Sequence, residues 1–224
     1  MMIDWIPVVL TLKLACATTM LLLIVGVPLA CWLTFSRHPL QPLVSTVVTM
    51  PLVLPPSVLG FYLLILLGPN GPVGRWTQHV LGMRLVFSFA GLVIGASIFS
   101  LPFMVNAVKA GLASIPRNLI EASYSLGKGR LQTVWSIVLP HARPAVIGGS
   151  VMSFAHTIGA FGIILMLGGN IPGQTRVASV AIYSEVEAVN YTAAHAYSLT
   201  LLAISFFVVI VMNMTNKKSA GVLG

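Results

Sequence analysis

Three polar residues inside a long apolar run, residues 144–168, are the first candidates for chemistry. His156 and Thr157 follow Ser153 by three and four positions, so a helix would carry two hydroxyl groups and an imidazole on one face. Such groups can hydrogen-bond a polar solute, and a histidine inside a membrane helix marks a functional site by default. The alternative is a histidine whose hydrogen bond only packs two helices together. Residue spacing leaves both interpretations open.

Other patterns typical of catalysis or metal binding do not occur in the sequence. The five histidines show no metal-ligand spacing, and there is neither an HExxH segment nor a serine–histidine–aspartate arrangement. Glu185 and Glu187 are two positions apart, which does not suit one face of a helix. We therefore expect no enzymatic activity and no cofactor.

The composition indicates an integral membrane protein. Of 224 residues, 57% are hydrophobic and only 7% are charged, whereas a soluble domain has about 25% charged residues. A chain this apolar has too few polar residues to form the surface of a soluble globular protein. The net charge of +8 comes from lysines and arginines scattered between apolar runs, so we expect no nucleic-acid partner and a chain embedded in the lipid bilayer.

Five apolar segments are long enough to cross a bilayer, which takes about 20 residues in a helix. We predict an all-α membrane protein with spans at approximately 11–35, 43–67, 86–110, 144–168 and 195–215. Together they predict one transmembrane domain over residues 11–215. An odd number of spans places the two termini on opposite sides of the membrane.

The distribution of cations predicts the orientation, since cytoplasmic loops carry an excess of lysine and arginine. With the N-terminus outside, eight cations fall on the inner side and four on the outer side. The inner eight are Arg37, Lys109, Arg117, Lys128, Arg130, Arg143, Lys217 and Lys218. We therefore expect the N-terminus outside and the C-terminus inside.

The second span contains three prolines, Pro51, Pro55 and Pro56. Each proline removes a backbone donor and clashes with the preceding turn, so the helix should kink or break near its middle. A tolerated kink is one interpretation. The other is a broken helix whose polar backbone faces a solute path.

A polar segment, residues 114–140, separates the third and fourth spans. Pro116 suits the first turn of a helix, and Gly127 suits the left-handed residue that ends it. Apolar residues at helical spacing from 131 to 139 predict a second short helix, which Pro140 should end. The segment is predicted to form two cytoplasmic helices bent around Gly127, which we call the elbow.

The residues of the elbow allow two roles. Lys128 and Arg130 could rest on lipid headgroups beside an amphipathic helix. Glu121, next to the small residues Ala122 and Ser123, instead suits insertion into a groove of another protein. Periodicity alone does not separate lipid contact from protein docking.

The motif of the elbow resembles a known family. The elbow is similar to the EAA motif of bacterial binding-protein-dependent ABC importer permeases in its residues Glu121-Ala122, Gly127 five residues later, and Ile137-x-Leu139-Pro140. The usual second alanine of that motif is Ser123 in this chain. The resemblance implies that Glu121, Ala122, Ser123, Gly127, Leu139 and Pro140 couple the permease to a cytoplasmic ATPase.

Further segments resemble the molybdate ABC-transporter permeases within this family. These are Met50 to Gly60, Gly68 to Gly74, Ser153 to Thr157 and Gly169 to Arg176. Sulfate and tungstate permeases are similar, so these anions stay as alternatives. One residue departs from the pattern: Ala160 stands where the family commonly has glutamate.

The resemblance implies a bacterial inner-membrane importer without catalytic residues of its own. Its implied partners are a second copy of the chain, an ABC ATPase dimer and an extracytoplasmic molybdate-binding protein. A candidate translocation path comprises Pro55, Pro56, Ser153, His156, Thr157, Gly159 and Gly162, and candidate outer-face contacts are Asn170 and Arg176. A passive channel is the alternative from another class, although a channel has no need of an ATPase-docking elbow.

Overall fold

Helices make up all the secondary structure in the computed structural model, which describes residues 4–220 apart from the side chains of residues 117, 130, 212, 213 and 215–220. The α-helices are α1 (Ile6–Phe35), α2 (Gln41–Thr49), α3 (Pro56–Leu67), α4 (Pro72–Leu81), α5 (Phe89–Ala113), α6 (Arg117–Ser125), α7 (Arg130–Thr133), α8 (Leu139–Ile158), α9 (Gly162–Gly168), α10 (Ala178–Glu187) and α11 (Tyr191–Ala220). A 3-10 turn, η1 (Met50–Leu52), follows α2, and a π-turn, η2 (Val134–Val138), precedes α8.

Three helices are long and apolar enough to cross a membrane by themselves: α1, α5 and α11. Two bent pairs, α2–η1 with α3 and α7–α8 with α9, raise the number of candidate spans to five if each pair is one span. The sequence predicted spans at 43–67, with a kink or break, and at 144–168. The first pair bends by 119° and the second by 64°, so neither is a continuous helix.

The proline cluster explains the larger bend. Pro55 adopts an extended backbone with φ of −55° and ψ of 135°, and α3 begins at the next residue, Pro56. Pro51 lies within the 3-10 turn that ends the first half. The predicted break in the second span is confirmed, and it turns the chain through more than a right angle.

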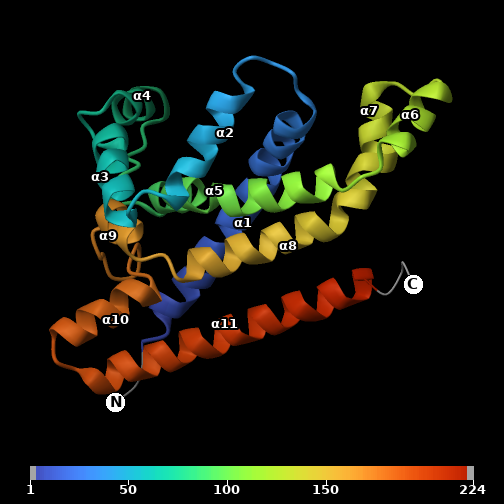
Figure 1. Ribbon diagram of the computed structural model, residues 1–224. Helices are drawn as coiled ribbons and strands as arrows, with labels where there is room; N and C mark the ends of the chain where they lie inside the picture. Colours follow the sequence, from blue (N-terminus) through green and yellow to red (C-terminus); the bar gives the residue numbers. More distant parts are fainter. Residues whose placement is uncertain (1–3, 221–224) are drawn as a thin grey trace.

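Three helices, α1, α5 and α8, pack along one another and form the centre of the molecule (Figure 1). One apolar cluster joins α5 to α3 and α9 and includes Leu92, Ile163 and Leu167. A second joins α1, α5 and the start of α8 and includes Leu33 and Met104. α11 lies against α8 and α10. The two clusters hold the bent helices at one end of the bundle and the elbow at the other.

The elbow continues directly into α8, contrary to the prediction that Pro140 ends its second helix. Leu139 donates its backbone N–H to the carbonyl of Val134, five residues back, in the π-turn η2. Pro140 then occupies the first turn of α8, where its missing N–H costs little. The wider π-turn accommodates the proline, so the helix runs on into the membrane bundle.

Candidate functional site

A hydrogen-bonded network joins α5 to the end of α8. The Ser100 hydroxyl lies 3.1 Å from His156 Nδ1 and 3.1 Å from Thr157 Oγ1. Thr157 Oγ1 in turn donates to the Ser153 carbonyl at 2.8 Å. The sequence predicted His156 and Thr157 on one side of a helix, and the structure adds Ser100 as the partner of both side chains.

Two phenylalanines of α5 enclose the imidazole of His156. The centroids of the Phe99 and Phe103 rings lie 4.3 Å and 4.1 Å from the centroid of the imidazole. The histidine therefore packs between two helices, as one interpretation of the sequence held. Its ring also borders an open pocket, as the other interpretation requires.

The pocket beside His156 has a volume of about 550 Å³ and lies where both bent helix pairs change direction. Its wall consists of Pro56, Ser57, Phe99, Ala155, His156, Gly159, Ala160, Phe161 and Gly162. Four predicted path residues, Pro56, His156, Gly159 and Gly162, thus lie together, and Pro55 precedes the wall by one position. Phe99 of α5 was not predicted, because no spacing pattern connects it to His156.

The other two predicted path residues do not line this pocket. Ser153 and Thr157 are buried within the bundle. The Ser153 hydroxyl has no hydrogen-bond partner in the described part of the chain, whereas its carbonyl accepts from Thr157. Thr157 reaches the pocket only through the Ser100 and His156 side chains.

Ala160, the departure from the family pattern, is buried in the wall of the pocket. Its carbonyl accepts a hydrogen bond from the Ser179 hydroxyl of α10 at 2.7 Å. Residue 160 follows His156 by four positions. A carboxylate at this position would meet the same pocket as the imidazole.

The glycine turn of the elbow has the geometry expected from the sequence. Gly127 has a φ of +74°, and its N–H donates to the Tyr124 carbonyl while the N–H of Lys128 donates to the Ser123 carbonyl. These two bonds make a Schellman motif, which ends α6 on a left-handed residue. The predicted role of Gly127 in ending the first helix is confirmed.

A buried pair of hydroxyls holds the two halves of the elbow together. Ser123 Oγ lies 2.9 Å from Thr133 Oγ1, and Thr133 also donates to the Gly129 carbonyl. Both side chains are buried. Ser123 therefore points into the elbow and fixes the angle between α6 and α7.

The rest of the motif faces outward or sits at the root of α8. Glu121, Ala122 and Pro140 are exposed, and Leu139 is half-buried. Tyr124 and Leu126 add exposed apolar surface to the same helix and turn. The elbow thus presents one carboxylate and several apolar groups on its outer side.

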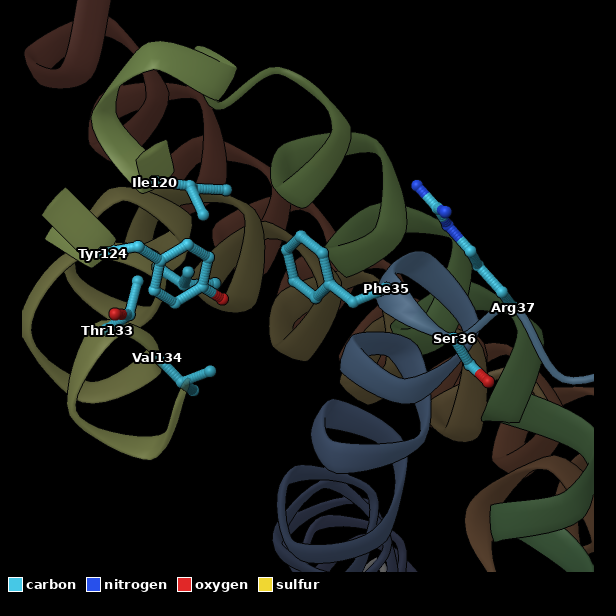
Figure 2. Close-up of a pocket in the computed structure, with 8 residues that line it drawn as sticks. Phe35, Ser36, Arg37, Ile120, Tyr124, Thr133 and Val134 are labelled. Carbon is cyan, nitrogen blue, oxygen red and sulfur yellow. The ribbon is translucent and has the colours of Figure 1, made fainter. Parts of the chain in front are cut away.

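A groove of about 660 Å³ separates the elbow from the end of α1 (Figure 2). Phe35 and Tyr124 lie on opposite walls, and Thr133 and Val134 belong to the wall formed by the elbow. Ile120 packs against the second apolar cluster of the core. The elbow therefore contacts the bundle through a few side chains, beside an open groove.

Asn170 and Arg176 are joined in one polar cluster with α10. Arg176 Nε donates to Asn170 Oδ1 at 2.8 Å, and Asn170 Nδ2 donates to Ser184 Oγ at 2.9 Å. Asn170 has a φ of 57°, a left-handed conformation that asparagine tolerates. These two predicted outer-face residues thus anchor the loop that precedes α10.

Glu185 and Glu187 lie in the last turn of the short helix α10. Glu185 accepts a hydrogen bond from Asn190 at 2.7 Å. The hydrogen bond between the Tyr183 phenol and Glu187, together with the negative charge of Glu187, raises the pKa of Tyr183. The two carboxylates therefore have different partners, as their spacing of two suggested.

Metal binding has no support in the part of the chain that the structure describes. Among these residues, no three His, Cys, Asp or Glu side chains gather where they could hold an ion.

Curated relatives match between 82% and 97% of the chain. The molybdenum transport system permease protein ModB of Azotobacter vinelandii is 43% identical over 97% of this chain and 96% of its own length. ModB of Escherichia coli K12 is 34% identical over 82% of this chain and 80% of its own length. The sulfate transport system permease protein CysT of Escherichia coli K12 is 30% identical over 84% of this chain and 68% of its own length.

Solved transporters share the fold. A chain of the MetNI methionine ABC transporter superimposes with a TM-score of 0.74 at 19% identity, covering 95% of this chain and 94% of the other. A chain of a bacterial alginate ABC transporter gives 0.71 at 19% identity, covering 94% and 79%. At this identity the likeness shows the fold alone.

The family profile agrees with these relatives. Residues 23–220 match the binding-protein-dependent transport system inner membrane component. The name describes a membrane subunit that works with a solute-binding protein and, in an ABC importer, with a separate ATPase. The chain belongs to the binding-protein-dependent transport system inner membrane components and is a permease subunit of an ABC importer.

Proposed function

We propose that the chain transports a tetrahedral oxyanion across the inner membrane, and that this anion is molybdate. The observation that carries the proposal is the 43% identity over 97% of the chain with a molybdenum permease. The sulfate permease CysT is 30% identical over a smaller share of the chain. Sulfate and tungstate are the alternatives within the same chemistry.

The working assembly in this proposal is a homodimer with an ATPase dimer on one side and a molybdate-binding protein on the other. One transmembrane domain spans residues 11–215, with the N-terminus outside and the C-terminus inside. The uneven distribution of cations supports this orientation. In Figure 1 the elbow lies at the same end of the bundle as the last turn of α11, which is consistent with both being cytoplasmic.

The elbow is proposed to couple this permease to the ATPase. Its exposed Glu121 and Ala122 suit a groove on a partner, while Ser123 and Gly127 hold the bend. Leu139 and Pro140 lie at the start of α8, through which a displacement of the elbow reaches the bundle. Glu121→Lys should therefore reduce uptake without preventing membrane insertion.

The translocation path is proposed to pass the pocket beside His156. Pro55 and Pro56 lie at the sharper of the two helix bends, and Gly159 and Gly162 lie at the other. Ser153 and Thr157 do not line the pocket but belong to the hydrogen-bonded network that includes Ser100. Asn170 and Arg176 are proposed to position the loop before α10 for contact with the binding protein.

Reconstitution of the permease with its ATPase and binding protein in proteoliposomes tests the choice of anion. We expect molybdate to stimulate ATP hydrolysis and to accumulate inside, with tungstate similar and sulfate much weaker. A response to sulfate alone would overturn the molybdate assignment. Flux that is independent of ATP would favour a passive channel instead.

A further inference from the structure

The pocket beside His156 contains a single titratable side chain. Of the nine residues in its wall, only His156 ionises; the others are glycine, alanine, proline, serine and phenylalanine. Alanine at position 160 means that no carboxylate shares the wall with the imidazole. The charge of this pocket is therefore set by one proton on His156.

The hydrogen bonds of Ser100 and Thr157 determine which nitrogen of the neutral His156 imidazole carries the proton. The Ser153 carbonyl can only accept, so the Thr157 hydroxyl donates its hydrogen there. Ser100 must then donate to Thr157 Oγ1, which uses the only hydrogen of the Ser100 hydroxyl. The Ser100 oxygen consequently accepts from His156 Nδ1–H.

This arrangement determines what His156 offers to a solute. In the neutral imidazole, a proton on Nδ1 leaves Nε2 with a lone pair and no hydrogen. Such a nitrogen accepts hydrogen bonds and repels the oxygen of an anion. One further proton, taken from water in the pocket, turns Nε2 into a donor and gives the ring a positive charge.

We propose that His156 forms a proton-dependent subsite for the oxyanion in the pocket, with Ser100 holding Nδ1 and the protonated Nε2–H donating to an oxygen of the anion. The proposal rests on the proposed function of the chain as an oxyanion permease and deepens it. Phe99 and Phe103 contact the ring, and aromatic faces attract a cation. Both rings pack against the imidazole without competing for its N–H.

The neighbouring helices contribute no charge to the pocket. α5 provides Phe99, Ser100 and Phe103, and α3 provides Pro56 and Ser57. From α9 comes Gly162. The other packed helices carry Tyr183 of α10, whose ring contacts Phe161, and the exposed Lys13 of α1 and His195 of α11. None of these three lines the pocket.

The pH dependence of transport tests the subsite. Molybdate uptake per ATP hydrolysed is measured in proteoliposomes between about pH 5 and pH 8, the range in which imidazole titrates, with binding protein saturated at every pH. Wild-type uptake should fall about tenfold towards high pH, because one charge-assisted hydrogen bond is lost. His156→Gln, whose amide donates at every pH but carries no charge, should lower uptake at low pH below that of the wild type and lose the pH dependence.

Two further variants sharpen this experiment. His195→Gln removes an exposed histidine outside the pocket and should retain the wild-type pH profile. Ala160→Glu places a competing carboxylate in the wall and should depress uptake most at low pH. Uptake by the wild type that does not change with pH, or a His156→Gln profile that equals that of the wild type, would overturn the proposal.

Nitrogen-15 NMR of labelled histidine tests the hydrogen-bond arrangement without transport. The His156 signal, assigned by its loss in His156→Gln, should report Nδ1–H at high pH and a shift of Nε2 when molybdate is added at low pH. An Nε2–H tautomer at high pH would contradict the proposal. Failure of the wild type to transport any oxyanion at any pH would instead contradict the proposed function. The NMR experiment would still test the tautomer of His156, because it does not depend on transport.

Discussion

Ser123 and Thr133 show how one pair of side chains sets the shape of the elbow. Their hydroxyls lie 2.9 Å apart in a buried position, between the two halves of the elbow. A buried hydrogen bond of this kind contributes about 1 kcal/mol. Alanine, the usual residue at this position in the motif that the elbow resembles, could not form this bond.

Removal of the Ser123 hydroxyl should loosen the elbow while the permease stays active. In Ser123→Ala, Thr133 keeps its bond to the Gly129 carbonyl, so no donor is left unsatisfied. We expect hydrogen–deuterium exchange in residues 117–133 to rise about fivefold, corresponding to about 1 kcal/mol, with uptake largely retained. Ser125→Ala, on the exposed side of α6, should leave exchange unchanged. Unaltered exchange in Ser123→Ala would show that the bond is not needed.

At the scale of the elements, the elbow depends on a backbone conformation that favours glycine. Gly127 adopts a φ of +74°, and a side chain added there would meet no atom within 4 Å. The cost of any substitution is therefore conformational, about 1–2 kcal/mol. Gly129 is equally open but has no positive φ, so it provides a matched control.

Gly127→Leu should uncouple the permease, whereas Gly129→Leu should not. The strained turn disfavours the bent elbow by about 1–2 kcal/mol, a factor of 5–30 in its population. Uptake per ATP hydrolysed should fall accordingly, while the amount of protein in the membrane stays constant. Equal uptake in the two variants would contradict a coupling role for the bend.

Helices α3 and α9 of the two bent pairs pack closely at Gly60. A Cβ at Gly60 of α3 would lie 3.0 Å from Met166 Cβ and 3.1 Å from the Ile163 backbone of α9. The contact against backbone cannot relax by a change of rotamer. The close approach of α3 to α9 therefore favours glycine at this position.

Gly60→Leu should separate α3 from α9 and destabilise the protein. Overpacking of this kind costs about 1–3 kcal/mol, which thermal unfolding in detergent would detect as a lower midpoint. Gly148→Leu on α8 is the control, because nothing lies within 4 Å of its added Cβ. A midpoint for Gly60→Leu equal to that of the control would show that the two helices tolerate wider spacing.

At the scale of the whole molecule, the bundle separates two functions along its length. The bent helices and the His156 pocket lie at one end, and the elbow lies at the other, linked by α5 and α8 (Figure 1). Because α8 carries both the root of the elbow and His156, a displacement at one end has a continuous helical route to the other. The proposed orientation places the elbow in the cytoplasm.

Cysteine accessibility in intact cells tests this orientation. With Cys16 and Cys31 replaced by serine, single cysteines at the exposed positions Tyr124 and Val189 report opposite ends of the molecule. A membrane-impermeant maleimide should label Val189→Cys from outside and should label Tyr124→Cys only after the membrane is opened. The reverse pattern would invert the topology predicted from the positive charges.

Local chemistry encoded much of this protein directly. Its apolar composition required a membrane, the prolines at 51, 55 and 56 predicted a broken helix, and the glycine at 127 predicted the turn of the elbow. These features follow from single residues acting on their own backbone, so a sequence is sufficient to reveal them. The EAA-like motif was recognised for the same reason, since its residues lie within 20 positions.

Tertiary structure alone decided where the helices turn and which side chains meet. The 119° bend and the continuation of α8 through Pro140 depend on packing and on a π-turn, which proline spacing does not specify. Ser100 reaches His156 across 56 positions, because α5 and α8 pack at a particular rotation about their axes. An apolar helix of nearly uniform hydrophobicity does not encode that rotation, so the site became visible only in the folded bundle.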